Sequence, residues 1–334
     1  MVNPFHSRRG CLRMTTDMDV VTKNADDYGE KWFADLSSFE ENLVSAWGRR
    51  WSVSSEVGKL RAVLLRRPGK EIEIVKNPAD WRWKDVMDPQ KARDQHDAMA
   101  EVYRSCGSDV FYVEEQRDDR PNALFMRDNV LGTPEGAILC RQATAFRRGE
   151  ERAVAVALAK IGCPIVRTIS GNGVFEGACG LWIDRETIVL GTGVRSNEEG
   201  VRQVEDVLKA MGVVNILRFQ IPWGHAHLDG LMNPVDRKKL LLFPWQVPYD
   251  ILDILIRKGF KIIEAPSVDE VKRGCAVNVV ALEPGRVLMS KGNPLTKAEL
   301  ERNGVEAIEI EVDELKKGYG SLHCMTAFLE RDPI

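Results

Sequence analysis

The sequence has no run of about 18 apolar residues, the length that a membrane-spanning helix needs, and its first residues lack the apolar stretch of a secretory signal. It also lacks an excess of either charge, because 47 basic and 50 acidic residues give a formal net charge of −3. Nucleic acids and acidic membranes bind basic faces. We therefore expect neither of them as a partner.

The cysteines form no C-x-x-C pair. All seven are scattered along the chain, as Cys11, Cys106, Cys140, Cys163, Cys179, Cys275 and Cys324. An odd and dispersed set is typical of reduced thiols, which predicts a cytoplasmic protein.

No stretch rich in proline, glycine and serine divides the chain, and its composition is ordinary for a globular protein. We predict an N-terminal extension over residues 1–50 and one domain over residues 51–334.

The extension combines a basic segment with a helix. Residues 1–13 contain three arginines and no acidic residue, which is typical of a disordered terminus, and Met14 is an alternative start. The stretch "SSFEENLVSAW" begins at Ser37 and has apolar residues at helical spacing. Ser37 and Glu40 fit a capping box, so we predict an amphipathic helix there.

Beyond the extension, one pattern recurs five times. An apolar β run leads to an amphipathic helical stretch, a glycine suited to a left-handed helix C-cap and a second β run. In one copy "TIVLG" precedes "NEEGVRQVEDVLKAM", a glycine and "VVNILRF". The glycines, spaced by 45 to 55 residues (304 − 259 = 45; 162 − 107 = 55), are Gly107, Gly162, Gly212, Gly259 and Gly304. Repetition at this period predicts a propeller or a closed array, and five units can close a ring.

Unusual polar residues occur in the short segments that precede the modules, for example "GNGVFEGACGLWID" and "GHAHLDGLMNPVD". The segment "LHCMTAFLERD" comes last, where a circular arrangement places it beside the first module. Corresponding segments of a ring approach its axis together. We therefore expect a single pocket to contain Asp128, Glu176, His227, Asp229 and Cys324.

A thiol, an imidazole and three carboxylates suit a planar cation. The carboxylates would repel one another without a cation between them, and a guanidinium offers forked N–H donors that carboxylates bind in pairs. Cys324 would attack the central carbon as a thiolate, while His227, paired with Glu176, would move protons to the leaving amine and from the incoming nucleophile. A metal enzyme is the alternative, in which His225 and His227 share a strand face next to Asp229.

The motifs "NALFMRD", "FEG", "HLD", "HCM" and the closing "RDPI" resemble, in order and spacing, those of the guanidino-modifying enzyme superfamily, the penteins. This superfamily includes arginine deiminases, dimethylarginine dimethylaminohydrolases and amidinotransferases. The resemblance covers residues 50–334. It implies an α/β-propeller with five ββαβ modules around a pseudo-fivefold axis, a covalent amidino-cysteine intermediate, and neither a metal nor an organic cofactor. A non-catalytic pentein that only binds a partner would have lost the pocket residues, and all five are present.

The resemblance also implies roles for individual residues. Cys324 is similar to the family nucleophile, His227 to the general acid/base and Glu176 to the carboxylate that pairs with this histidine. Asp128 and Asp229 resemble the guanidinium clamps. The other candidates are expected to contact the rest of the substrate: Asn122 and Phe125 in the pocket wall, and Arg195 and Arg147 at the substrate carboxylate. A guanidinium and a carboxylate together indicate L-arginine or a close analogue.

The chain departs from the deiminase pattern. Deiminases commonly read E-G-G-D where this chain reads Glu176-Gly177-Ala178-Cys179, and the loop before the nucleophile has Tyr319 and Ser321 but no arginine. Amidinotransferases tend to have Asp in place of Glu176, which favours hydrolysis here. The products would be citrulline and ammonia, or ornithine, carbon dioxide and more ammonia. Dimethylarginine hydrolases tend to have an acidic residue in place of Arg127, which makes that substrate less expected.

We therefore predict a cytoplasmic hydrolase of the guanidino group of arginine. An amidinotransferase that moves the amidino group to an amine is the alternative. Pentein hydrolases often form dimers, which leaves a homo-oligomer open.

Overall fold

The structure is a computed structural model that describes residues 36–114 and 117–334. The basic segment in residues 1–13 and the alternative start Met14 lie outside the described residues. The chain forms two units, Met1–Glu41 and Asn42–Ile334, and each is described by itself. A domain boundary at residue 51 stays a prediction.

Helix α2 (Phe39–Trp47) is present, but its capping box lies one residue later than predicted. The Ser38 backbone N–H donates to Glu41 Oε2 at 2.7 Å, and the Glu41 N–H donates to Ser38 Oγ at 3.2 Å. Because the helix begins directly after Ser38, this residue is the N-cap and Glu41 is the third helical residue, the two places that a capping box requires. The prediction of Ser37 and Glu40 as the box is therefore wrong.

The unit Asn42–Ile334 contains five sheets of three strands each. In every sheet the first two strands are antiparallel, and the second and third are parallel. The sheets are β15 (Ala327–Arg331), β1 (Leu60–Leu65) and β2 (Asp109–Tyr112); β3 (Val130–Thr133), β4 (Gly136–Leu139) and β5 (Ile165–Thr168); β6 (Gly180–Asp184), β7 (Thr187–Thr192) and β8 (Asn215–Gln220); β9 (Met232–Asp236), β10 (Lys239–Leu242) and β11 (Lys261–Glu264); and β12 (Val280–Glu283), β13 (Arg286–Ser290) and β14 (Glu306–Ile310).

A helix joins the second and third strands of every sheet, because parallel neighbours need a crossover connection. These helices are α3 (Pro89–Ser105), α4 (Glu150–Ile161), α5 (Glu198–Ala210), α6 (Tyr249–Arg257) and α7 (Pro294–Arg302). Each ends one or two residues before a predicted capping glycine. The φ angles of these glycines confirm the left-handed caps: 83° at Gly107, 78° at Gly162, 82° at Gly212, 83° at Gly259 and 68° at Gly304. Within the described ranges, no helix combines the length and apolarity needed to cross a membrane.

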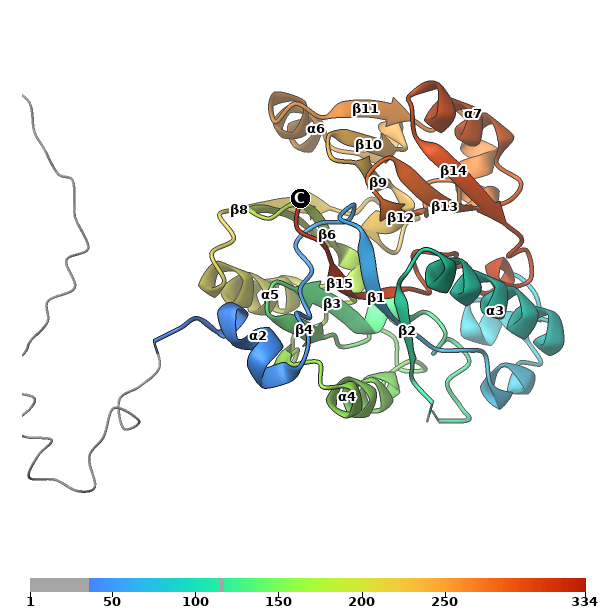
Figure 1. Ribbon diagram of the computed structural model, residues 1–334. Helices are drawn as coiled ribbons and strands as arrows, with labels where there is room; N and C mark the ends of the chain where they lie inside the picture. Colours follow the sequence, from blue (N-terminus) through green and yellow to red (C-terminus); the bar gives the residue numbers. More distant parts are fainter. Residues whose placement is uncertain (1–35, 115–116) are drawn as a thin grey trace, which may run out of the picture. The chain divides into compact units, whose positions relative to one another are not determined.

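The last strand closes the ring of modules. Strand β15 pairs antiparallel with β1, and Phe328 lies opposite Val63. In each sheet the first strand is almost entirely buried, whereas the third strand is the most exposed. Helices α3 to α7 accordingly lie toward the outside of this unit, with the first strands nearer its middle (Figure 1). The segments that lead into the first strands therefore meet at the centre.

Removal of β15 should prevent closure of the ring. A chain that ends at Thr326 leaves β1 without its antiparallel partner and also loses Arg331, whose guanidinium donates to the Gly58 and Ala281 carbonyls. We expect this chain to show no cooperative thermal transition by circular dichroism. The matched control ends at Asp332, keeps β15 and should melt within about 3 °C of the full chain. A cooperative transition near that of the full chain in the shorter protein would contradict the ring-closing role.

Candidate active site

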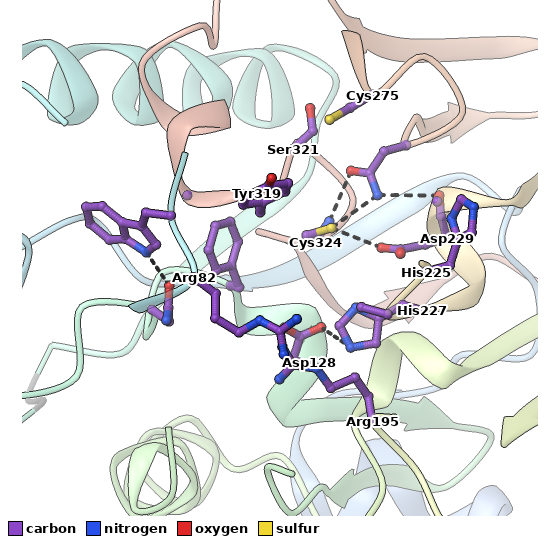
Figure 2. Close-up of a pocket in the computed structure, with 18 of the residues that line it drawn as sticks. Arg82, Asp128, Arg195, His225, His227, Asp229, Cys275, Tyr319, Ser321 and Cys324 are labelled. Carbon is purple, nitrogen blue, oxygen red and sulfur yellow. Dashed lines mark hydrogen bonds and ion pairs between the residues drawn. The ribbon is translucent and has the colours of Figure 1, made fainter. Parts of the chain in front are cut away.

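Short helical turns position the polar side chains at the centre of the ring. Four of the segments before the first strands form 3-10 helices, namely η4 (Met126–Asn129), η5 (Gly177–Cys179), η6 (Leu228–Gly230) and η9 (Leu315–Gly318). In chain order these segments carry Asp128, Glu176, His227 with Asp229, and Cys324. The structure brings all five residues together at one pocket of about 900 Å³. Figure 2 shows Asp128, His227, Asp229 and Cys324 around it. Four of them line the pocket, and Glu176 lies behind His227.

The partly exposed His227 forms a close pair with the buried Glu176. The imidazole Nε2 lies 2.7 Å from Glu176 Oε2 and 3.6 Å from Asp128 Oδ1. Burial alone would lower the pKa of His227, but the charge of Asp128 and the hydrogen bond to Glu176 outweigh it and raise this pKa. Burial alone would raise the pKa of Glu176, but the hydrogen bond with His227 lowers it to about 2. The pair therefore favours an imidazolium next to a carboxylate, which can supply a proton to a leaving group.

Cys324 contacts Asp229 and Asn278. Its thiol donates to Asp229 Oδ2 at 3.3 Å, and the Asn278 side-chain N–H donates to the sulfur at 3.1 Å. The Asn278 amide oxygen accepts the backbone N–H groups of His323 at 3.0 Å and of Cys324 at 3.4 Å. Burial raises the pKa of the Cys324 thiol well above its ordinary value, and the negative charges of Asp229 and Asp128 raise it further. A bound cation would compensate these charges and favour the thiolate.

Arg147 lies behind Asp128. Its guanidinium contacts Asp128 Oδ2 and forms a two-pronged pair with Glu150, at 3.0 Å from Nε to Oε1 and 2.8 Å from Nη2 to Oε2. It also donates to the carbonyls of Asn122 and Phe125 at 3.3 Å each. The prediction placed Arg147 at the substrate carboxylate. In the structure Arg147 lines the pocket, and its guanidinium is bound to two carboxylates and two carbonyls of the protein, which fixes Asp128. A contact with the substrate carboxylate stays a prediction.

The other predicted pocket residues also line the pocket. Asn122 accepts the indole N–H of Trp83 at 2.5 Å and donates to the Trp81 carbonyl at 3.2 Å, so its amide is held in place. Phe125 packs against the loop before Cys324, where a Cβ on Gly320 would lie 2.1 Å from the ring. Arg195 donates to Glu176 Oε1 at 3.2 Å.

The pocket lining differs in charge between its buried and exposed parts. The buried lining contains Asp128, Asp229 and the guanidinium of Arg147, which is paired with Asp128 and Glu150. Arg82 and Lys272 are exposed lining residues with no ion pair to any described residue. Apart from the paired Arg147, the pocket thus offers negative charge inside and positive charge at its mouth. A ligand with a cation at one end and an anion at the other matches this arrangement.

Sequence reasoning missed Asn278, His323 and Arg82. A signal for Asn278 was available, because "CAVNVVALEP" precedes the fifth module and corresponds to the other four segments. The fivefold pattern alone would have nominated the polar residue in it. His323 belongs to the "HCM" motif, of which only the cysteine was given a role, and Arg82 had no comparable signal, since an isolated arginine is common in any sequence.

Carboxylates and a histidine also suit a metal ion. Among the described residues, Asp128, Glu176 and His227 have one potential ligand atom each within 4.8 Å of the others. This group differs from the set in the alternative reading as a metal enzyme, which combined His227 with His225, Asp229 and a cysteine.

Cys179 is fully buried in the hydrophobic core, and burial raises the pKa of its thiol well above the ordinary value. Ala178 and Cys179 are both buried, and neither lines the pocket.

Comparisons with known proteins agree with this geometry. The family described as "N,N dimethylarginine dimethylhydrolase, eukaryotic" matches residues 75–331. The N(G),N(G)-dimethylarginine dimethylaminohydrolase of Pseudomonas aeruginosa is 27% identical over 242 residues, which cover 72% of this chain and 89% of that protein. An arginine deiminase of Borrelia duttonii is 22% identical over 402 residues, which cover 85% of this chain and 98% of that protein.

Solved structures share the fold. The N-terminal domain of ArgZ, an arginine dihydrolase from the ornithine–ammonia cycle in cyanobacteria, has a TM-score of 0.70 at 18% identity, covering 81% of this chain and 98% of that one. SxtG, an amidinotransferase from Microseira wollei, has a TM-score of 0.69 at 17% identity, covering 85% of this chain and 98% of that one. The predicted pentein propeller is confirmed.

The reactivity of Cys324 in the free protein should rise steeply with pH. Because its thiol pKa lies well above the ordinary value of 9.0, the thiolate fraction should grow about tenfold per pH unit between pH 7 and 9. Iodoacetamide labelling of the Cys324 peptide, followed by mass spectrometry, measures this. Asp229→Asn removes one of the negative charges and should shift the rise to lower pH. A plateau of wild-type labelling below pH 8 would contradict the raised pKa.

Proposed function

The chain belongs to the N,N-dimethylarginine dimethylhydrolase family of guanidino-modifying enzymes, and we propose that it hydrolyses the guanidino group of L-arginine or a close analogue. The observation that most supports this proposal is the meeting of Cys324, the His227–Glu176 pair and two further carboxylates at one pocket. The reaction forms a covalent amidino-cysteine intermediate and releases ammonia.

Two buried oxygen atoms of the pocket lack a hydrogen-bond donor among the described residues, which favours a ligand with several N–H groups. Asp128 Oδ1 and Ser321 Oγ are buried lining atoms that have no hydrogen-bond partner among the described residues. Unpaired buried polar atoms are costly, so a bound donor would stabilise them. A guanidinium that bridges Asp128 and Asp229 supplies such donors and brings its central carbon close to Cys324.

Cys324 acts as the nucleophile. The bound guanidinium compensates the carboxylates that raise the pKa of the thiol, and the resulting thiolate attacks the central carbon. The bond to a terminal nitrogen then breaks, and His227 supplies the proton with which ammonia leaves. Water adds to the remaining carbon while His227 takes up one of its protons. The carbon–sulfur bond then breaks to give citrulline and free thiolate, and the remaining hydroxyl proton is released to solvent, where it protonates the ammonia. A second cycle on citrulline would give ornithine, carbon dioxide and more ammonia.

The far end of the substrate is anionic in this proposal. Arg195 lines the pocket, and the unpaired Arg82 extends the positive charge toward the mouth. We assign Arg195 to the substrate carboxylate and Arg147 to the support of Asp128. Arg127 is fully buried against Glu56 and does not line the pocket. Dimethylarginine hydrolases tend to have an acidic residue at this position that contacts the substrate. That contact is absent here, which favours arginine as the substrate.

Transfer of the amidino group to an amine is the alternative reaction. A volume of about 900 Å³ lies near the upper end of the range for ligand pockets, so an acceptor has room next to arginine. The acceptor would take the place of water in the second half of the cycle.

Product analysis separates these reactions. Purified protein is mixed with L-arginine, with and without glycine or lysine, and amino acids and ammonia are quantified. We expect citrulline with one ammonia, or ornithine with two, whether or not an amine is added. Ornithine that appears only with an added amine would contradict hydrolysis. Turnover of dimethylarginine but not of arginine would overturn the substrate assignment.

The same assay tests the nucleophile. Cys324→Ser should lower turnover by about 10⁴-fold or more with an unchanged melting temperature, because a serine hydroxyl is a far weaker nucleophile at this site. The matched control is Cys106→Ser, which alters a cysteine beyond the end of α3 that does not line the pocket and should keep full activity.

A further inference from the structure

A buried row of ionisable side chains lies behind Asp229 and is not needed to contact the substrate. It consists of His323, Glu56 and Arg127, and none of the three is more than 2% exposed. None of them lines the pocket. Buried charges persist only where they are paired, so this row needs an explanation beyond packing.

His323 connects this row to the nucleophile. Its Nδ1 lies 3.0 Å from Asp229 Oδ2, which is the same oxygen that accepts the Cys324 thiol at 3.3 Å. The imidazole and the thiol therefore share one acceptor atom. A second donor on this oxygen weakens its hold on the thiol proton and fixes the plane of the carboxylate that faces the pocket.

Glu56 and Arg127 hold the other side of the imidazole. Glu56 Oε2 lies 3.4 Å from His323 Nε2, while Oε1 accepts Arg127 Nη2 at 2.8 Å and the Trp182 backbone N–H at 3.3 Å. Burial alone would raise the pKa of Glu56, but the charge of Arg127 lowers it to about 2. An ionised carboxylate in a fixed place keeps the imidazole ring oriented toward Asp229.

Phe328 completes this arrangement. The guanidinium carbon of Arg127 lies 5.0 Å from the centroid of its ring, and the His323 ring meets the same ring edge-on at 5.2 Å and 78°. Phe328 belongs to β15, so the strand that closes the ring also restrains the imidazole. The ring of His323 is thus held on three sides by Asp229, Glu56 and Phe328.

We propose that His323 is a positioning residue that, held by Glu56 and Arg127, orients the Asp229 carboxylate and tunes the Cys324 thiol that shares its oxygen. The substrate-binding part of this inference rests on the proposed guanidino hydrolysis. The part that concerns the thiol does not, because thiol reactivity is measurable without any substrate.

Two substitutions of similar size separate positioning from packing. The amide of His323→Asn can replace Nδ1 and donate to Asp229, whereas the longer His323→Gln places its amide near the Nε2 position, toward Glu56. The first readout is the pH dependence of Cys324 labelling by iodoacetamide in the free protein. The second is the division of any activity loss between KM and kcat with the guanidine that the wild type turns over.

His323→Gln should slow Cys324 labelling at pH 9 by about tenfold and raise KM by about ten- to a hundredfold, with a smaller change in kcat. His323→Asn should stay within about threefold of the wild type in both readouts, because the donor to Asp229 is kept. Equal behaviour of wild type and His323→Gln would overturn the proposal. A loss in His323→Asn as large as that in His323→Gln would overturn it as well.

A second variant keeps the test decisive if His323→Gln does not fold. Glu56→Gln retains the shape of this side chain but removes the charge that faces the imidazole, and it should slow Cys324 labelling by about threefold or more. Labelling at the wild-type rate would contradict the role of the buried row. If the wild type turned over no guanidine, the proposed function would fail, while the labelling comparison would still decide the role of His323.

Discussion

Pairing of buried negative charge is the constraint on which this site depends. Asp128, Glu176 and Asp229 are almost completely buried around one pocket, and a buried carboxylate without a partner is strongly destabilising. Each has a cationic or hydrogen-bonding partner: Arg147 pairs with Asp128, His323 with Asp229, and the pocket-lining His227 and Arg195 with Glu176. The partners of Asp128 and Asp229 leave the pocket side of these two carboxylates for a ligand. The site is therefore stable when empty and still attracts a cation.

The ring of five modules makes this pairing feasible. Every module delivers one polar segment to the centre, so groups far apart in sequence contact each other without long loops. Glu56 and His323, which are separated by 267 residues, meet because β15 pairs with β1. The same closure places Cys324 opposite residues from the second, third and fourth modules. The antiparallel pairing of β15 with β1 therefore both closes the ring and assembles the site.

Much of this fold could be predicted from the sequence, because the signals are local and repeated. Apolar periodicity and the five glycines at helix ends predicted the modules, and the motif positions predicted which residues would meet. Pairing between buried groups was not predictable in the same way. Arg147 resembles a substrate-binding arginine in the sequence, but its guanidinium lies on Asp128 and Glu150, which only the three-dimensional arrangement reveals. The contacts of His323 with Asp229 and Glu56 depend on ring closure and on side-chain rotamers, which the sequence does not reveal, whereas the segment that carries Asn278 could have been identified from the fivefold pattern.

Mass spectrometry of the intact protein, quenched in acid during turnover of L-arginine, tests the central claim most directly. Covalent catalysis by Cys324 with ammonia as the first product predicts an adduct on this residue with the mass of arginine less one ammonia. An adduct of the amidino group alone would instead mean that ornithine leaves first, as in amidino transfer. A covalent mechanism at this cysteine would be contradicted if arginine were turned over without an adduct on Cys324 at any quench time and no adduct accumulated on Cys324 in variants of His227.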